Sequence, residues 1–385
     1  MVAGEPVKID QSVFVDLLEN SVVNGRVPYL RALEKSQIQY FELLELARKA
    51  EVPHPLFFAP PAVVQAQLST KSAKLLQGVA PDTFTVNSRT TVKLRDVELI
   101  VKDLLRKQEF ARKHDPTLVK NRIVGLLRKP RPTVREDAET LVNALGLDRN
   151  AIRRARKKEN ALDIIVERLE ANQVLVSRSV RGFMPQLIEV RFSGMTVRDS
   201  KVPYIFLAGG DHGDFQEPIG RQIFTLVLMA VLVARGIFAP VSYDANSSAP
   251  DAGREYDIVG EILMPAAELQ GITLEDLDDV KAASDLFKVT PSALAVRAMR
   301  LSRLSPLTTN GYLRELEMEF RARTKPNVRQ PKPVNAIRKY TGRALATRML
   351  QAVDEQRLST REFCRVVCLN RIGPGEIGEL RAAVQ

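Results

Sequence analysis

The feature that most constrains this chain is an apolar run, GRQIFTLVLMAVLVARG, at residues 220–236. The run carries no ionisable side chain between Arg221 and Arg235. Its uninterrupted part, residues 223–234, would form about 18 Å of helix at 1.5 Å per residue. A membrane span needs roughly 20 apolar residues. The run therefore predicts a helix that is buried in the core of a globular protein.

The composition is typical of a globular protein. The chain has 385 residues, enough for two or three domains, and 45% of them are hydrophobic and 27% charged. The first residues, MVAGEPVKIDQSVF, lack the basic and apolar stretches of a secretory signal, so we expect a cytoplasmic protein with no membrane anchor. Cys364 and Cys368 are four residues apart, a helical spacing that does not favour a disulfide, and we expect two buried, reduced thiols.

The formal net charge is +11, which suits a nucleic acid or an acidic protein as partner. The basic residues gather at 126–132, at 149–160 and at 320–343, although a solvated surface or a linker would look the same. Aromatic residues do not alternate with them, so a platform for stacking single-stranded bases is not indicated. The candidate binding residues are Arg128, Lys129, Arg131, Arg153, Arg154, Arg156, Lys157 and Lys158.

Hydrophobic periodicity predicts an α+β protein that is mainly helical. Residues 95–116 have the pattern of a long amphipathic helix, and further helices are expected at about 133–145 and 147–158. Three short β-like segments follow, and they predict a small three-stranded sheet packed against the apolar helix. The expected strands are 174–180, 187–194 and 202–210.

The order of these segments resembles the ImmA/IrrE family of zinc metallopeptidase-like regulatory proteins, in the long form that begins with an Xre-like helix-turn-helix. The resemblance runs over roughly residues 8–380. It rests on ELLELARKAEVPHPLFFAPP, LRDVELIVKDLLRKQEFARK, the strand end IFLAGG with RQIFTL after it, and YDIVGEILMP. The implied parts are a degenerate helix-turn-helix (1–62), a helical connecting region (63–160), a zincin-like domain (161–320), a basic linker (321–333) and a C-terminal helical module (334–385).

In that family, Phe-Thr-Leu is followed by Ala-His-Glu-Leu-Gly-His, in which two histidines bind zinc and the glutamate is the general base. On this frame, the ligand positions of this chain are Leu228 and Leu232, and the base position is Met229. These side chains can neither bind zinc nor transfer a proton. Glu255 lies near the position of the third ligand and is a candidate relic of it.

Other metal ligands are sparse. The loop before the apolar helix offers Asp211, His212, Asp214 and Glu217, a set that would hold a divalent ion only weakly, and an ordinary surface loop is the simpler interpretation. No Ser or Cys nucleophile has a His base at a recognisable spacing. We therefore expect no catalytic site and no cofactor.

The N-terminal module also departs from the family. Only residues 22–35 lie where a scaffold helix and a recognition helix are needed, which is about ten residues too few on the usual layout. Arg26, Tyr29 and Arg31 are candidates for contact with phosphate. Sequence-specific reading of DNA is therefore in doubt.

These features predict a catalytically inactive protein that acts by binding another protein. Genes of the long form often stand beside a small PIN-type ribonuclease toxin or on mobile elements, so the resemblance implies an antitoxin or an immunity regulator. A PIN-type site is rich in carboxylates, and a basic inhibitor suits it. One alternative is an Xre-type regulator that binds DNA, and another is a divergent zinc peptidase that cleaves a repressor.

Overall fold

A computed structural model describes residues 6–19, 21, 23, 27–76, 97–180, 182–186, 188, 193–209, 217–241, 253–322 and 331–384. The described chain is mainly helical and has one small mixed sheet, so the expected α+β class is confirmed. In the same part of the chain, no helix has both the length and the apolar character of a membrane span.

The sheet has four strands in the order β1-β3-β2-β4, one more than expected. β1 (Leu175–Arg178) runs parallel to β3 (Tyr204–Leu207), and β2 (Gly194–Val197) pairs antiparallel with both β3 and β4 (Pro240–Val241). The first and third expected strands contain β1 and β3. The second expected strand, 187–194, lies mostly outside the described residues, and β2 begins only at its last residue.

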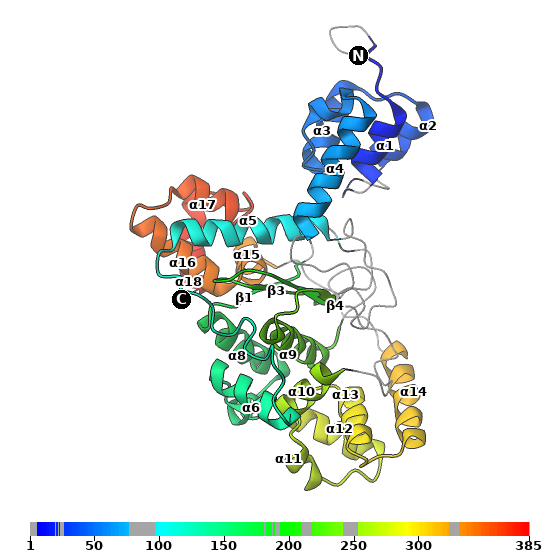
Figure 1. Cartoon of the computed structure of the whole chain (residues 1–385), viewed down its shortest axis with the longest axis vertical. Helices are drawn as coiled ribbons and strands as arrows, with labels where there is room; N and C mark the ends of the chain where they lie inside the picture. The colour runs from blue at the N-terminus through cyan, green and yellow to red at the C-terminus, as the bar shows by residue number, and fades with distance from the viewer. Residues whose placement is uncertain are drawn as a thin grey trace.

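Each face of the sheet contributes to a separate hydrophobic core. Val176, Ile205 and Leu207 belong to the core that holds the apolar helix, whereas Tyr204 and Phe206 belong to the core on the other face. This alternation follows from the period of two in a strand. Figure 1 shows the sheet between α9 on one side and the C-terminal helices with α5 on the other.

The apolar run forms α9 (Ile219–Arg235), and Gly236 ends it in the left-handed conformation, with φ 76°. α9 packs on β2 and β3 and also against α8 and α10, so it is covered on several sides. Its core contains most of the helices in the middle of the chain. These are α6 (Val134–Leu145), α7 (Arg149–Arg154), α8 (Lys158–Ala171), α10 (Arg254–Leu263), α11 (Ala266–Gln270), α12 (Leu277–Leu286), α13 (Pro291–Arg300) and α14 (Pro306–Ala322).

The expected long helix is α5 (Glu98–His114), and it packs with the C-terminal helices. Those helices are α15 (Pro333–Thr341), α16 (Arg343–Asp354), α17 (Thr360–Val366), the 3₁₀ turn η4 (Pro374–Glu376) and α18 (Ile377–Val384). Cys364 and Cys368 are free thiols buried in this core, as expected. Burial raises the pKa of the Cys368 thiol to about 12, so it is unreactive near neutral pH.

A third core belongs to the N-terminal helices alone. They are α1 (Gln11–Glu19), α2 (Val27–Lys35), α3 (Tyr40–Lys49), the 3₁₀ turn η1 (His54–Phe58) and α4 (Pro61–Leu76). Val64 of α4 is fully buried in this core, so α4 packs with the module and extends it past residue 62. We refer to residues 6–76 as the N-terminal module.

A buried carboxylate joins the middle of the chain to the C-terminal helices. Glu170, near the end of α8, is 6% exposed, and its Oε2 accepts a hydrogen bond of 3.1 Å from the backbone N–H of Ala344 in α16. Burial raises the pKa of Glu170 to about 7, against smaller lowerings by the backbone N–H groups of Ala344 and Val176 and by Arg178 and Arg343. Burial also raises the pKa of the nearby Tyr204 hydroxyl, with smaller contributions from Asp103 and Glu170.

We expect Glu170→Gln to stabilise the protein at pH 8 by about 2–3 kcal/mol and to have little effect at pH 4.5. The pKa of Glu170 in the folded state lies above its ordinary value of 4.5. Folding therefore favours the protonated form, and stability falls as the pH rises from 4.5 to about 7. The side-chain amide of the glutamine has an oxygen that can accept the hydrogen bond from the backbone N–H of Ala344, but it carries no charge. Melting temperatures at the two pH values measure the difference, and an equal shift at both would contradict this explanation.

Candidate binding surface

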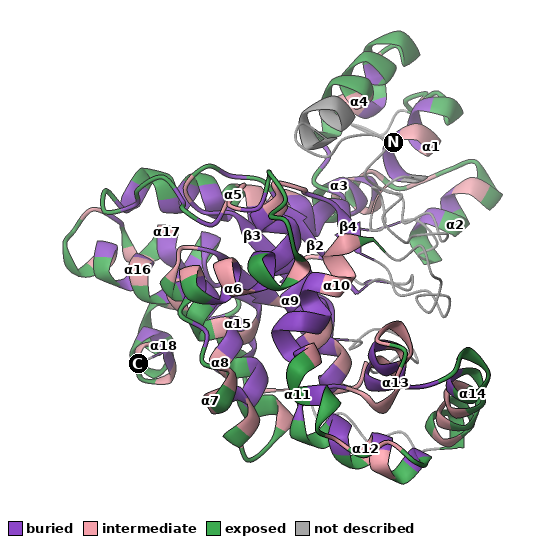
Figure 2. Cartoon of the chain, turned by 60° about the horizontal axis from the view of Figure 1, so that its bottom comes forward, coloured by how far each residue is buried: buried purple, intermediate pink, exposed green. Residues whose placement is uncertain are grey.

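The three positions that the resemblance aligns with the family's zinc motif lie among the buried residues of α9. Leu228, Met229 and Leu232 are 3%, 0% and 1% exposed, and Figure 2 shows α9 as a buried helix at the centre of the chain. A side chain at Gly194 would bring its Cβ within 2.8 Å of Met229 Sδ, so β2 lies directly against the position of the general base. These residues have no atom that fits zinc, and their side chains belong to the hydrophobic core.

Glu255, the candidate relic of a third zinc ligand, pairs with an arginine. Its Oε1 accepts a hydrogen bond of 3.1 Å from Arg235 Nε at the end of α9, and both side chains are largely buried. Arg235 also donates to the carbonyl of Leu127 over 2.8 Å. Glu255 is therefore neutralised by a fixed cation and links α9 to α10.

The remaining metal candidates, Asp211, His212 and Asp214, lie outside the described residues. Glu217, the last acidic residue of the same loop, accepts a hydrogen bond of 2.9 Å from Ser193 Oγ, and burial raises its pKa. Within the described ranges, no group of three or more His, Cys, Asp or Glu residues is placed to hold a metal ion.

Most of the excess positive charge is concentrated in one segment. Residues 120–158 contain twelve basic and four acidic residues, a net charge of +8 out of the +11 of the whole chain. This basic segment forms α6 and α7. Thr133 and Glu136 cap the start of α6 with reciprocal hydrogen bonds, Gly146 ends it with a φ of 65°, and Asp148 caps α7.

A buried carboxylate fixes the start of the basic segment against α10. Asp137 is fully buried, and it accepts hydrogen bonds from the backbone N–H of Arg131 (2.9 Å) and from Arg254 Nε (2.8 Å). Arg254 also donates to the carbonyl oxygen of Arg131 over 2.7 Å. The backbone at Arg131 is therefore held against Arg254, the first residue of α10. The side chain of Arg131 is exposed.

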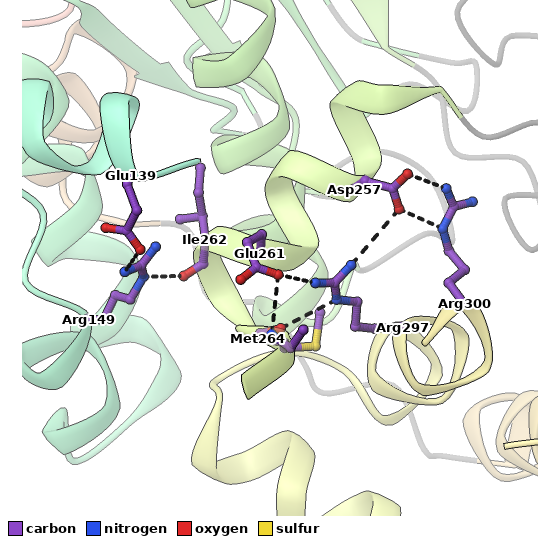
Figure 3. Close-up of polar contacts among 9 residues, drawn as sticks. Glu139, Arg149, Asp257, Glu261, Ile262, Met264, Arg297 and Arg300 are labelled. Carbon is purple, nitrogen blue, oxygen red and sulfur yellow. Dashed lines mark hydrogen bonds and ion pairs between the residues drawn. The ribbon is translucent and has the colours of Figure 1, made fainter. Parts of the chain in front are cut away.

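The end of the segment is fixed at the other end of α10. Arg149 donates to Glu139 Oε1 (2.8 Å) and to the carbonyl oxygen of Ile262 (3.1 Å), as Figure 3 shows. Arg254 and Ile262 are roughly 12 Å apart along the helix axis at 1.5 Å per residue. The two expected basic clusters therefore lie at opposite ends of one short, rigid helix.

Six of the eight predicted binding residues are exposed and form no ion pair with any described residue. They are Arg128, Lys129, Arg131, Arg154, Arg156 and Lys157. The other two form ion pairs with acidic residues of the same chain. Arg153 is 15% exposed and binds Glu268 over 2.9 Å, and Lys158 binds Asp285 and the carbonyl oxygen of Val289. We therefore define the basic surface by the six exposed residues and leave Arg153 and Lys158 out.

Arg128 has a fixed place at the end of α9. A Cβ added to Gly125 or to Gly236 would lie 3.4 Å from Arg128 Nη2, so the guanidinium rests over two glycines that have positive φ. The carbonyl groups at the C-terminus of a helix attract a cation. Replacement of either glycine would strain the backbone, because both have a positive φ.

Ion pairs between α10 and α13 support the same helix. Glu261 and Arg297 are each 7% exposed and join through Oε2 and Nη2 over 2.5 Å, and Arg300 binds Asp257 through two hydrogen bonds of 2.7 and 2.8 Å (Figure 3). Arg297 also donates to the carbonyl oxygen of Met264. These contacts fix α10, and with it the spacing of the two clusters.

The N-terminal module does not extend the basic surface. Residues 1–76 contain eight basic and eight acidic residues. Tyr29, a predicted phosphate contact, is 3% exposed and stacks on Phe14 with ring centroids 5.7 Å apart, so this prediction is wrong. Arg31 lies 3.7 Å from Glu42, and Arg26 lies outside the described residues.

Comparisons with family models, with characterised proteins and with solved structures find no match to this chain. What is established is the fold: the described chain is a mainly helical α+β protein with a small mixed sheet. Its resemblance to the ImmA/IrrE family stays a prediction from the sequence.

Proposed function

We propose that this chain is an ImmA/IrrE-like protein without peptidase activity that works by binding another protein. The observation that carries the proposal is the complete burial of Leu228, Met229 and Leu232 in α9. A catalytic zinc site needs three protein ligands and a fourth position that is open to water or substrate. Here the corresponding positions are occupied by aliphatic and thioether side chains that stabilise the core.

The basic surface supports a partner with an acidic face. Ion pairs such as Arg254–Asp137 hold the backbone near its six exposed cations, so mainly their side chains have to be ordered on binding. Complementary charge accelerates association and selects among partners. A PIN-type ribonuclease toxin, with its carboxylate-rich site, would fit this surface, and the chain would then act as its antitoxin or as an immunity regulator.

Co-expression with the product of the adjacent gene, followed by size-exclusion chromatography, tests the proposal. We expect a stable complex whose association rate falls steeply between 50 and 500 mM salt. The triple variant Arg154→Glu, Arg156→Glu and Lys157→Glu should weaken binding by at least about tenfold at low salt.

A matched control changes the net charge by the same amount elsewhere. Lys332, Arg361 and Arg365 are exposed in the C-terminal helices, and their triple reversal to Glu should leave the affinity nearly unchanged. Equal losses in the two variants would mean that only the net charge matters. Absence of any complex would remove the support for a protein partner.

The Xre-type regulator is the second candidate, and the concentration of positive charge at residues 120–158 is what favours it. A gel shift on the promoter of its own gene separates the two. Binding that is lost in moderate salt and has no sequence preference would mean phosphate contacts alone.

A further inference from the structure

The basic surface borders on a segment of the opposite charge. Residues 268–285 contain six acidic residues and one basic residue, a net charge of −5, whereas residues 120–158 have a net charge of +8. The acidic residues belong to α11, α12 and the turn between them, and Figure 2 shows these helices beside α7. The two segments of opposite charge therefore meet on the folded chain.

Two ion pairs fix the border between them. Arg153 of α7 donates to Glu268 Oε1 of α11 over 2.9 Å. Lys158 Nζ, at the first residue of α8, lies 2.7 Å from Asp285 Oδ1 of α12. Arg153 and Lys158 are each next in the sequence to an exposed cation of the basic surface. A partner that covers this end of the basic surface therefore also reaches the two carboxylates.

The carboxylates at this border remain accessible to a partner. The side chain of Glu268 is 45% exposed and that of Asp285 is 75% exposed. Asp278 lies seven residues before Asp285, which is about two turns, so both project from the same side of α12. Its side chain is 90% exposed, and its nearest cation, Lys281, also binds Glu319. We call Glu268, Asp278 and Asp285 the acidic edge.

We propose that the acidic edge selects the class of partner that the basic surface binds, and that this partner is a protein with basic side chains beside its carboxylates. The inference rests on the proposed function and specifies its partner. A nucleic acid carries negative charge along its whole length, so carboxylates next to the binding cations repel it. A protein can place a Lys or Arg against the acidic edge and its own carboxylates against the exposed cations. Unfavourable contacts with the wrong class of partner contribute to specificity as much as favourable contacts with the right one.

Reversal of the acidic edge should act in opposite directions on the two classes of partner. The double variant Asp278→Lys and Asp285→Lys extends the positive charge onto α12. We expect it to bind a DNA duplex of about 20 base pairs at least about tenfold more tightly than the original chain does, measured by fluorescence anisotropy in about 100 mM salt. The same variant should bind the product of the adjacent gene at least about tenfold more weakly, measured by calorimetry.

The matched control is the double variant Glu34→Lys and Glu109→Lys. Both residues are exposed, on α2 and α5, and Figure 1 shows these helices far from α11 and α12. The control changes the net charge by the same amount, but it should raise the affinity for the duplex by less than about threefold and leave the protein complex nearly unchanged. Melting temperatures of all variants show whether the fold is retained.

Equal gains in duplex binding by the two double variants would overturn the inference, because net charge alone would then explain them. A protein complex that forms and is unaffected by the variant of the acidic edge would overturn the inference and leave the proposed function intact. Absence of any complex with the adjacent gene product would overturn both.

Discussion

The triple substitution Leu228→His, Met229→Glu and Leu232→His, which would introduce a His-Glu-x-x-His motif into α9, is expected to unfold the protein. Each position is at most 3% exposed. Removal of a buried Leu or Met costs about 1.5–3 kcal/mol in lost burial, and an unpaired polar group in its place costs roughly 2 kcal/mol or more. The sum is comparable with the 5–15 kcal/mol that stabilise a typical domain.

Circular dichroism and thermal denaturation measure this effect, with and without added zinc. The control is Leu228→Met, which keeps an apolar side chain of similar volume and should cost less than about 1.5 kcal/mol. Zinc should not rescue the triple variant, because Arg235 holds Glu255 in an ion pair. A folded triple variant that takes up one zinc ion would contradict the account of α9.

Arg297→Ala is expected to destabilise the protein by about 3–5 kcal/mol. It removes the cation that pairs with Glu261 and leaves in the core a carboxylate with 7% exposure that keeps its hydrogen bond from the backbone N–H of Ala266. The double substitution Glu261→Leu and Arg297→Met replaces both charges with apolar groups and should cost much less. Denaturation by urea measures both variants.

The matched control for this prediction is Arg321→Ala. Arg321 pairs with Glu317 over 2.6 Å on the surface of α14, with side chains 75% and 57% exposed. Solvent screens such a pair, and its loss should cost less than about 0.5 kcal/mol. Equal costs at Arg297 and Arg321 would mean that burial does not govern these ion pairs.

The helices with strong periodicity could be predicted from the sequence, and the small strands only in part. α9 and α5 follow from long apolar patterns, and Gly236 marks the end of α9. β4 consists of only Pro240 and Val241, too few residues to show a period of two, and it exists because β2 offers it a hydrogen-bonded edge. That edge is a tertiary contact that a local pattern does not contain.

The binding surface shows the same limit. The concentration of basic residues is visible in the sequence, but nothing local separates Arg153 from Arg154. In the folded chain, Glu268 lies beside Arg153, whereas Arg154 is exposed to solvent. Tyr29 likewise looks like an exposed side chain in a short helix until Phe14 is placed beside it.

The burial of the motif positions is the part of the account that the sequence anticipates best. An uninterrupted apolar run predicts core packing, and α9 is covered by the sheet, α8 and α10. The apolar run does not reveal which residue pairs with Glu255. Its partner Arg235 belongs to the end of the same run, yet the two residues meet only because α10 folds back onto α9.

Zinc analysis of the purified chain tests the central claim most directly. The protein is prepared without chelators, its metal content is measured by mass spectrometry, and zinc is then titrated into the apo form by calorimetry. We expect well below one zinc per chain after dialysis and no tight binding in the titration. One equivalent of zinc that survives dialysis would contradict the assignment of Leu228 and Leu232 as core residues in place of ligands.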